Sequence, residues 1–170
     1  IFKEYYANPK ATAEAFADGW FRTGDRARLD NDGSWSIIGR VKEQFKTAKG
    51  KYVAPVPIES LLARNPDIEQ GCVLGSGRKQ PLAIAVLSEQ ARDRTQSTHN
   101  RLVDTLNEVN SELESHQRLD HLVISDEEWS IENDLLTPTL KIKRNKLEDR
   151  YGDYLLRSLE EPVVWEKELA

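Results

Sequence analysis

GRVKEQFKTAKGKYVAPVPIE, residues 39–59, is the stretch that organises the chain. Two short segments able to form strands flank the turn Lys49-Gly50-Lys51, so this stretch predicts a hairpin with a glycine at its tip. Pro57 suits the first turn of a helix that runs to about residue 63. The stretch therefore predicts a hairpin followed directly by a helix.

The composition changes at Gly39, where strand-like segments end and basic residues begin. The segments before it that read as strands are WFRTGD, RARLD and SWSII, with Asn31-Asp32-Gly33 as a hairpin turn. We therefore expect a domain boundary and a hinge at this point. Residues 1–40 would belong to one domain and residues 41–170 to the next.

Helices and strands are also predicted before and after residues 39–59. Upstream, Asn8 and Pro9 predict the start of a short helix over residues 8–17. Downstream, the apolar segments GCVLG and PLAIAVL predict strands, and Leu122–Ile124 predicts a shorter one. A helix is indicated by an apolar stripe at offsets of four, three and four, made of Leu102, Leu106, Val109 and Leu113. Residues 135–139 read as a loop and residues 146–159 as a helix, so the class is α+β or mixed α/β.

Composition excludes several classes of protein. No stretch approaches the roughly 20 apolar residues of a spanning helix, and no charged and apolar leader opens the chain, so we expect neither membrane crossing nor export. Cys72 is the single cysteine, and the three histidines show no ligand spacing with it, which excludes a disulfide framework and structural zinc. Because the 170 residues include no methionine, we expect them to be a piece of a longer protein.

The net charge of -5 hides two basic islands. Residues 39–51 carry five basic residues against Glu43, and residues 138–150 carry five against Glu148 and Asp149. Clustered positive charge raises the local potential and suits recognition of an anion. A solvated charged face is the alternative for either island taken alone.

Three segments carry candidate chemistry. In WFRTGD, Asp25 follows a glycine at a strand end, where a carboxylate can accept hydrogen bonds from the vicinal hydroxyls of a ribose, although an ordinary turn aspartate fits too. In residues 39–59, Arg40 and lysines around a glycine turn could bind phosphates, or could keep an exposed strand edge from aggregating. In LLTPTLKIKR, residues 135–144, a loop with proline and two threonines presents Lys141, which suits an anionic transition state or a plain surface position.

The order and spacing of these segments resemble the C-terminal end of the adenylate-forming enzymes, which include acyl-CoA synthetases, luciferases and nonribosomal adenylation domains. WFRTGD is similar to the ribose-binding motif, residues 39–59 to the hinge and hairpin motif, and LLTPTLKIKR to the motif of the catalytic lysine. IENDLLTPTLKIKR, KGKYVAPVPIE and IEQGCVLGSGRKQPLAIAVL look most like the long-chain fatty acyl-CoA synthetase branch.

The resemblance implies the fold and the activity. It implies an α+β fold with a small mixed lid domain, residues 41–170, in which helices flank a short sheet, preceded by the last strands of a larger N-terminal AMP-binding domain, residues 1–40. The whole enzyme would use ATP to convert a fatty acid to an acyl-adenylate and would then transfer the acyl group to CoA. Magnesium ligands are expected outside this chain.

The resemblance also implies roles for particular residues. Asp25 would hold the ribose of ATP, Arg40 would contact the nucleotide, and Lys42 occupies the hinge position. Lys141 would bridge the fatty acid carboxylate and the α-phosphate. The hairpin would follow the pantetheine arm of CoA, with Gly50 allowing close approach. Lys49 and Tyr52, which flank that glycine, are weaker CoA contacts.

The chain departs from the family pattern in two ways. Leu140 stands before the catalytic lysine where many members have glycine, which is compatible with the long-chain branch and argues against a nonribosomal domain. No Ser/Thr/Gly-rich phosphate loop followed by Pro-Lys occurs, so the 170-residue chain should be inert alone. Its partners would be ATP, CoA, the acid and its own N-terminal domain.

Alternatives to this function stay open at the level of sequence. The acid could be aryl or medium-chain, because the acyl pocket is expected upstream. A non-catalytic module that binds an anion is the other alternative. The negative net charge and the lack of aromatic residues among the basic ones argue against nucleic acid. We expect a cytoplasmic protein, with peripheral membrane association left open.

Overall fold

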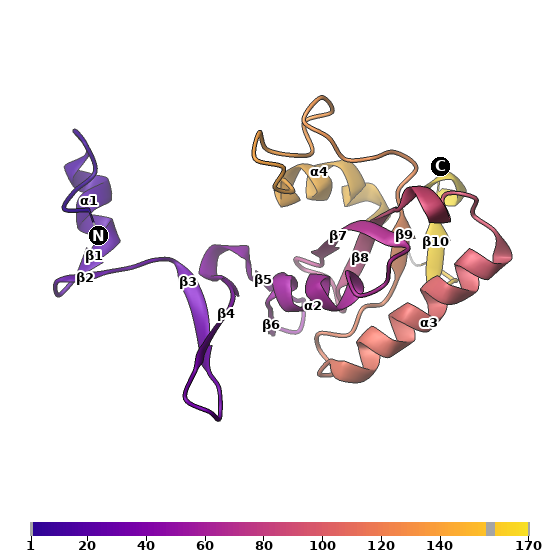
Figure 1. Cartoon of the computed structure of the whole chain (residues 1–170), viewed down its shortest axis with the longest axis horizontal. Helices are drawn as coiled ribbons and strands as arrows, with labels where there is room; N and C mark the ends of the chain where they lie inside the picture. The colour runs from indigo at the N-terminus through magenta and orange to yellow at the C-terminus, as the bar shows by residue number, and fades with distance from the viewer. Residues whose placement is uncertain (1, 156–158, 170) are drawn as a thin grey trace. The chain divides into compact units, whose positions relative to one another are not determined.

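The computed structural model describes residues 2–155 and 159–169 and separates into two compact units (Figure 1). The first unit is Ile1–Glu43 and the second is Gln44–Ala170. The division falls after residue 43, whereas the sequence placed a domain boundary after residue 40. The assignment of these parts to a large domain and a lid stays a prediction.

The first unit begins with helix α1 (Pro9–Ala15). Asn8 caps this helix, because its side-chain oxygen accepts a hydrogen bond from the Ala11 backbone N–H at 3.0 Å. The predicted helix, residues 8–17, ran two residues too far at its C-terminal end, and Asn8 is its cap rather than its first residue. Phe16–Ala17 is strand β1, which pairs antiparallel with β2 (Trp20–Phe21) across a turn of two residues with positive φ, Asp18 and Gly19.

A hairpin of β3 (Asp25–Leu29) and β4 (Trp35–Arg40) completes the strands of this unit. Its turn contains Gly33 at φ 85°, as the sequence Asn-Asp-Gly predicted. The register pairs Asp25 with Arg40, so the first residue of one strand faces the last residue of the other. A 3-10 turn, η1 (Val41–Glu43), follows β4 and ends the unit.

The second unit is built around a four-stranded sheet with the order β10-β9-β8-β7. Strands β7 and β8 are antiparallel, whereas β8, β9 and β10 run parallel. The elements of this unit are β5 (Phe45–Lys46), β6 (Tyr52–Val53), α2 (Pro55–Leu62), β7 (Ile68–Leu74), β8 (Leu82–Leu87), η2 (Glu89–Ala91), α3 (Gln96–Glu112), β9 (Leu122–Ile124), α4 (Arg144–Leu155), β10 (Val163–Trp165) and η3 (Glu166–Leu169).

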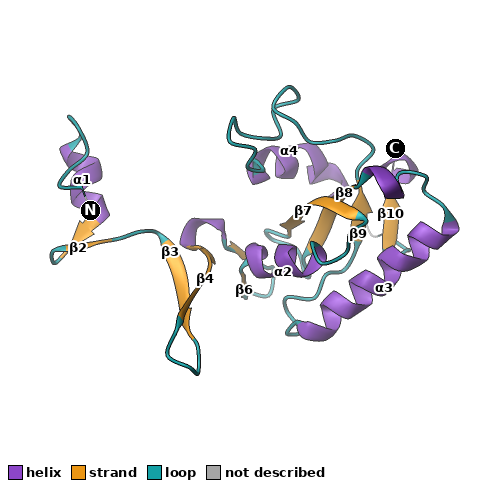
Figure 2. Cartoon of the chain, in the orientation of Figure 1, coloured by secondary structure: helices purple, strands orange, loops and turns teal. Residues whose placement is uncertain are grey.

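Helices cover both faces of this sheet (Figure 2). One buried cluster joins the sheet to α2, α3 and the hairpin β5–β6, and a second joins it to α4 and the segment before α4. Every residue of β8 is buried, as the apolar run of this strand predicted. Helices and a small sheet therefore build the unit, and the predicted α+β class is confirmed.

Two helices of the second unit also differ from their predicted bounds. Leu113 lies one residue beyond the end of α3, although it still packs against the core. Helix α4 begins at Arg144 rather than at residue 146, and part of its predicted end, residues 156–158, lies outside the described residues. Within the described residues, no helix has both the length and the apolar character needed to span a membrane.

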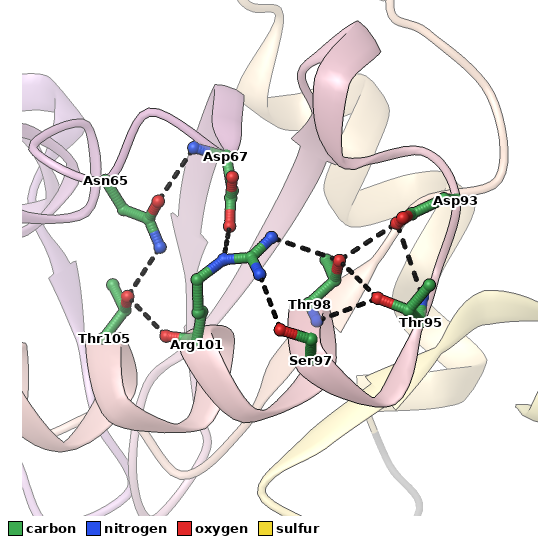
Figure 3. Close-up of polar contacts among 8 residues, drawn as sticks. All are labelled: Asn65, Asp67, Asp93, Thr95, Ser97, Thr98, Arg101 and Thr105. Atoms are coloured by element: carbon green, nitrogen blue, oxygen red, sulfur yellow. Dashed lines mark hydrogen bonds and ion pairs between the residues drawn. The ribbon is translucent and has the colours of Figure 1, made fainter.

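A polar network fixes α3 to the loop that precedes β7 (Figure 3). Arg101 on α3 donates to Asp67 at 2.6 Å and to Thr98 at 3.2 Å. One turn further along α3, Thr105 accepts a hydrogen bond from Asn65 at 2.6 Å. These contacts join residues that are 34 and 40 positions apart in sequence, so they hold α3 against the segment that precedes β7.

Candidate functional site

Asp25 and Arg40 form an ion pair at the open end of the β3–β4 hairpin. Arg40 Nε lies 2.9 Å from Asp25 Oδ1, and Arg40 Nη1 donates to the Thr23 carbonyl at 2.9 Å. The Asp25 backbone N–H donates to Thr23 Oγ1 at 3.0 Å, which holds the turn before the strand. The Asp25 side chain stays 30% exposed, so its carboxylate is accessible to a ligand. The structure brings these two predicted residues together.

Gly50 lies at the tip of the β5–β6 hairpin, at φ 78°. Its N–H donates to the Thr47 carbonyl at 2.9 Å, and Thr47 N–H donates to the Lys51 carbonyl at 2.9 Å. A Cβ added at Gly50 would meet Lys46 Cε at 3.7 Å, an ordinary contact. The backbone angle, rather than crowding within the chain, is therefore what requires glycine here.

The side chains near this tip point to solvent. Lys49 and Tyr52 are exposed, and Lys46 Nζ lies 5.7 Å from the centre of the Tyr52 ring. Such a contact between a cation and an aromatic face is weak at an exposed site. The hairpin thus presents a basic and aromatic surface beside its glycine tip.

The base of the hairpin is buried and firmly attached. Phe45 and Val53 pack into the cluster with α2 and α3. The Gly77 N–H donates to the Lys46 carbonyl at 3.0 Å, and the Ala48 N–H donates to the Arg78 carbonyl at 2.7 Å. The tip is therefore exposed on a rigid support.

Lys141 lies in a short loop closed by its own hydrogen bonds. The Thr137 N–H donates to the Lys141 carbonyl at 2.8 Å, and the Lys141 N–H donates to Thr137 Oγ1 at 3.0 Å. Leu136 and Ile142 form an isolated antiparallel bridge at the base of the loop. The Lys141 side chain is exposed, as the sequence predicted for a lysine presented by a Pro/Thr loop.

Leu140, the residue before that lysine, has φ 58°. This is the left-handed region, which a leucine adopts at a cost of about 1–2 kcal/mol and glycine adopts freely. The Leu140 side chain is 69% exposed, so burial compensates for little of this strain. The structure thus gives a physical reason why glycine suits this position.

One acidic residue, Asp134, holds the base of the loop through two ion pairs. Asp134 pairs with Lys143 and, at 3.0 Å, with Lys146. Hydrogen bonds and charge from Lys143, and then from Lys146, lower the pKa of the Asp134 carboxyl. Two cations of the second basic island are therefore engaged in local structure.

The predicted site residues occupy three separate places. Asp25 and Arg40 lie in the first unit, where Lys42 belongs to the turn η1. The Gly50 hairpin packs on the sheet face covered by α2 and α3. The loop of Lys141 packs through Leu135 and Leu136 on the opposite face, against α4. The Gly50 hairpin and the Lys141 loop, the two basic elements of the second unit, thus lie on different sides of one sheet.

Sequence reasoning assigned no role to Glu59 and Arg144, although both lie in the quoted segments. The structure joins them by an ion pair at 2.7 Å. They are 85 positions apart in sequence, so no local pattern could pair them. The sequence feature that could have drawn attention to this pair is Glu59 itself, a charged residue among the mostly apolar residues of α2.

Comparisons with known proteins agree on one family. A model of the family described as "AMP-binding enzyme C-terminal domain" matches residues 42–157. The long-chain fatty acid-CoA ligase FadD15 of Mycobacterium tuberculosis is 32% identical, over 89% of this chain and 28% of that protein. Long-chain fatty acid-CoA ligase 4 of Saccharomyces cerevisiae is 35% identical, over 86% of this chain and 24% of that protein. The chain spans about a quarter of the length of these relatives.

A solved structure shares the fold. The A domain of the carboxylic acid reductase from Segniliparus rugosus, in complex with AMP and a co-purified carboxylic acid, matches with a TM-score of 0.76 and 29% identity. The match covers 91% of this chain and 26% of that chain. Both units of the chain therefore have counterparts in a protein that binds a nucleotide and an acid.

Proposed function

Because the chain belongs to the family of AMP-binding enzyme C-terminal domains, as its motifs predicted, we propose that it is part of a long-chain fatty acid-CoA ligase. In the first half-reaction a fatty acid carboxylate attacks the α-phosphate of ATP, giving acyl-adenylate and pyrophosphate. In the second, the CoA thiol attacks the acyl carbonyl and releases AMP. The observation that carries this proposal is the identity of 32% and 35% to two long-chain ligases over most of the chain.

Lys141 is the catalytic residue of this proposal. Its closed loop fixes the backbone through Thr137 and leaves the ammonium group exposed on a long side chain. Negative charge accumulates where a carboxylate approaches a phosphate, and a cation placed between them lowers that barrier. The charge is needed most during adenylation, because the acyl-adenylate no longer carries the carboxylate charge.

Asp25 and Arg40 are the nucleotide contacts of this proposal. A carboxylate can accept hydrogen bonds from both ribose hydroxyls, and the ion pair with Arg40 orients the Asp25 side chain. The remaining donors of Arg40 suit a phosphate or ribose oxygen. Magnesium would be held by residues outside this chain.

The hairpin is the CoA contact of this proposal. Gly50 provides the tight tip, and Lys49 and Tyr52 flank it with a charge and an aromatic face. The opposite placement of the hairpin and the Lys141 loop supports a rotation between the half-reactions. One rigid unit cannot turn both faces of its sheet toward the same reacting centre at once. Lys42 lies one residue before the end of the first unit, which suits a hinge.

The identity of the acid is tested on the intact enzyme with a panel of carboxylic acids. We expect pyrophosphate exchange into ATP to be fastest with long-chain fatty acids, and acyl-CoA to form when CoA is added. Fastest exchange with aryl or medium-chain acids would assign the enzyme to another acid. No exchange with any acid would favour a non-catalytic module that binds an anion.

A further inference from the structure

Two side chains complete the free edge of the sheet at Val73. Strand β7 is the last strand in the order β10-β9-β8-β7, so among the described residues no strand pairs with its outer edge. The Val73 N–H donates to Glu59 Oε1 at 2.8 Å, and Arg144 Nη1 donates to the Val73 carbonyl at 2.7 Å. Together the two side chains satisfy a donor and an acceptor that a further strand would otherwise satisfy.

The same two side chains bind each other. Arg144 Nη1 lies 2.7 Å from Glu59 Oε1, and it also lies 3.0 Å from Cys72 Sγ. The two side chains are 20% and 19% exposed, so solvent screens the pair less than the exposed ion pairs of this chain. A partly buried, hydrogen-bonded pair of this kind resists separation, because removing one partner leaves the other charge uncompensated.

The two partners belong to elements that adjoin the hairpin and the Lys141 loop. Glu59 lies in α2, the helix that directly follows the Gly50 hairpin. Arg144 is the first residue of α4 and comes three positions after Lys141. Both basic elements of the second unit are therefore fixed to one residue of β7, although they lie on opposite faces of the sheet.

Internal hydrogen bonds set the shape of the Lys141 loop but not its place on the sheet. The bonds between Thr137 and Lys141, and from the Lys143 N–H to the Leu135 carbonyl, stay within the loop. The ion pairs of Asp134 join the loop to the following turn of α4. Arg144 instead reaches across to α2 and β7, and so adds a polar attachment of the loop to the sheet beside the packing of Leu135 and Leu136.

We propose that Arg144 is a positioning residue, which with Glu59 holds the Lys141 loop at a fixed place relative to the sheet and the hairpin. The proposal rests on the proposed function, because it concerns the placement of the lysine during adenylation. Small displacements of a catalytic group reduce the rate strongly while leaving distant binding contacts intact. Arg144 would therefore affect the rate of one half-reaction rather than substrate binding in general.

The test compares Arg144→Met with Arg150→Met in the intact enzyme. Arg150 also lies on α4 and also forms an ion pair, with Glu127, but it makes none of the contacts to β7. We expect Arg144→Met to lower kcat for acid-dependent pyrophosphate exchange about 10- to 100-fold, with KM for ATP within about twofold of the parent. Transfer of the acyl group from supplied acyl-adenylate to CoA should be nearly unchanged, and Arg150→Met should resemble the parent in both steps.

Three results would overturn the proposal: unchanged exchange in Arg144→Met, equal loss of both half-reactions, or the same selective loss in Arg150→Met. If Arg144→Met does not fold, Arg144→Lys decides, since lysine keeps the charge but cannot make the same set of hydrogen bonds. Its exchange should be selectively reduced, and exchange equal to that of the parent would overturn the proposal.

Amide hydrogen exchange separates this proposal from the proposed function. In the chain itself, the Lys143 amide should exchange faster in Arg144→Lys than in Arg150→Met, because the loop loses part of its polar attachment to β7 and opens more often. Equal protection would overturn the anchoring role whatever the reaction is. An intact parent enzyme with no acid-dependent pyrophosphate exchange would instead refute the proposed function and leave the anchor to be judged from the amide data.

Discussion

Gly75 is the point at which the hairpin meets the sheet, and Gly75→Ala should loosen that contact. A Cβ at this position would lie 2.8 Å from Pro81 Cα and 2.9 Å from Phe45 Cε2. Pro81 contributes a backbone atom, and the Phe45 ring is 7% exposed and packed in the core. Neither neighbour has free space to move into, so the hairpin base must shift or the strand must bend.

The magnitude follows from two opposing effects. Overpacking a close contact costs about 1–3 kcal/mol. Replacing glycine with alanine also restricts the unfolded chain, which stabilises the folded state by roughly 0.4–1 kcal/mol. We therefore expect a net loss of about 1–2 kcal/mol in the free energy of unfolding. With a urea m-value of about 2 kcal/mol/M, the midpoint should fall by roughly 0.5–1 M.

The assay is urea unfolding of the chain, followed by tryptophan fluorescence, to which buried Trp129 contributes, and by far-ultraviolet circular dichroism. Gly71→Ala is the matched control, because Gly71 lies in the adjoining strand β7 and its added Cβ would meet its nearest neighbour, Ile68 Cγ2, at 4.0 Å. The control should keep or slightly raise the midpoint. An unchanged midpoint in Gly75→Ala, or an equal fall in both variants, would refute the packing argument.

Three further predictions follow from the hinge, the cysteine and the nucleotide contacts. Lys42→Pro should retain adenylation and lose most thioester formation in the intact enzyme, because proline fixes φ near -65°, and equal loss of both steps in a folded protein would argue against a hinge. Burial raises the pKa of the Cys72 thiol to about 12, so iodoacetamide at pH 8 should modify the unfolded chain much faster than the folded one. Since an unfolded thiol titrates near 8.5, this group should also lower the free energy of unfolding as pH rises from roughly 8.5 to 12, and a urea midpoint that rises over this range would contradict the burial argument. The isolated chain should fold yet bind ATP more weakly than micromolar in calorimetric titration, since it offers Asp25 and Arg40 but no phosphate loop, and micromolar binding would mean a more complete site.

Local signals predicted the elements whose patterns are strong. The apolar run of β8 and the stripe of Leu102, Leu106 and Val109 in α3 identified buried elements correctly. Strand β10 (Val163–Trp165) was missed because it forms by pairing with β9, which is about 40 positions away in sequence. Strand β1 was taken as the end of α1, because its pairing depends on a turn at Asp18 that carries no strong signal.

In the candidate site, too, local features could be predicted from the sequence and long-range contacts could not. Gly50 was predicted at a turn because glycine is a direct sign of positive φ, whereas the positive φ of Leu140 has no such sign. The pairing of Asp25 with Arg40 depends on hairpin register, and that of Glu59 with Arg144 on the packing of two helices against β7. Contacts of this kind depend on the tertiary fold, and the sequence pattern of either residue does not contain them.

Separate measurement of the two half-reactions in Lys141→Ala tests the assignment of the catalytic lysine most directly. The control is Lys146→Ala, which removes a nearby exposed lysine that pairs with Asp134. We predict that in the intact enzyme Lys141→Ala abolishes acid-dependent pyrophosphate exchange but still transfers supplied acyl-adenylate to CoA, while Lys146→Ala performs both steps. Pyrophosphate exchange that survives in Lys141→Ala would contradict the central claim that this lysine stabilises the adenylation transition state.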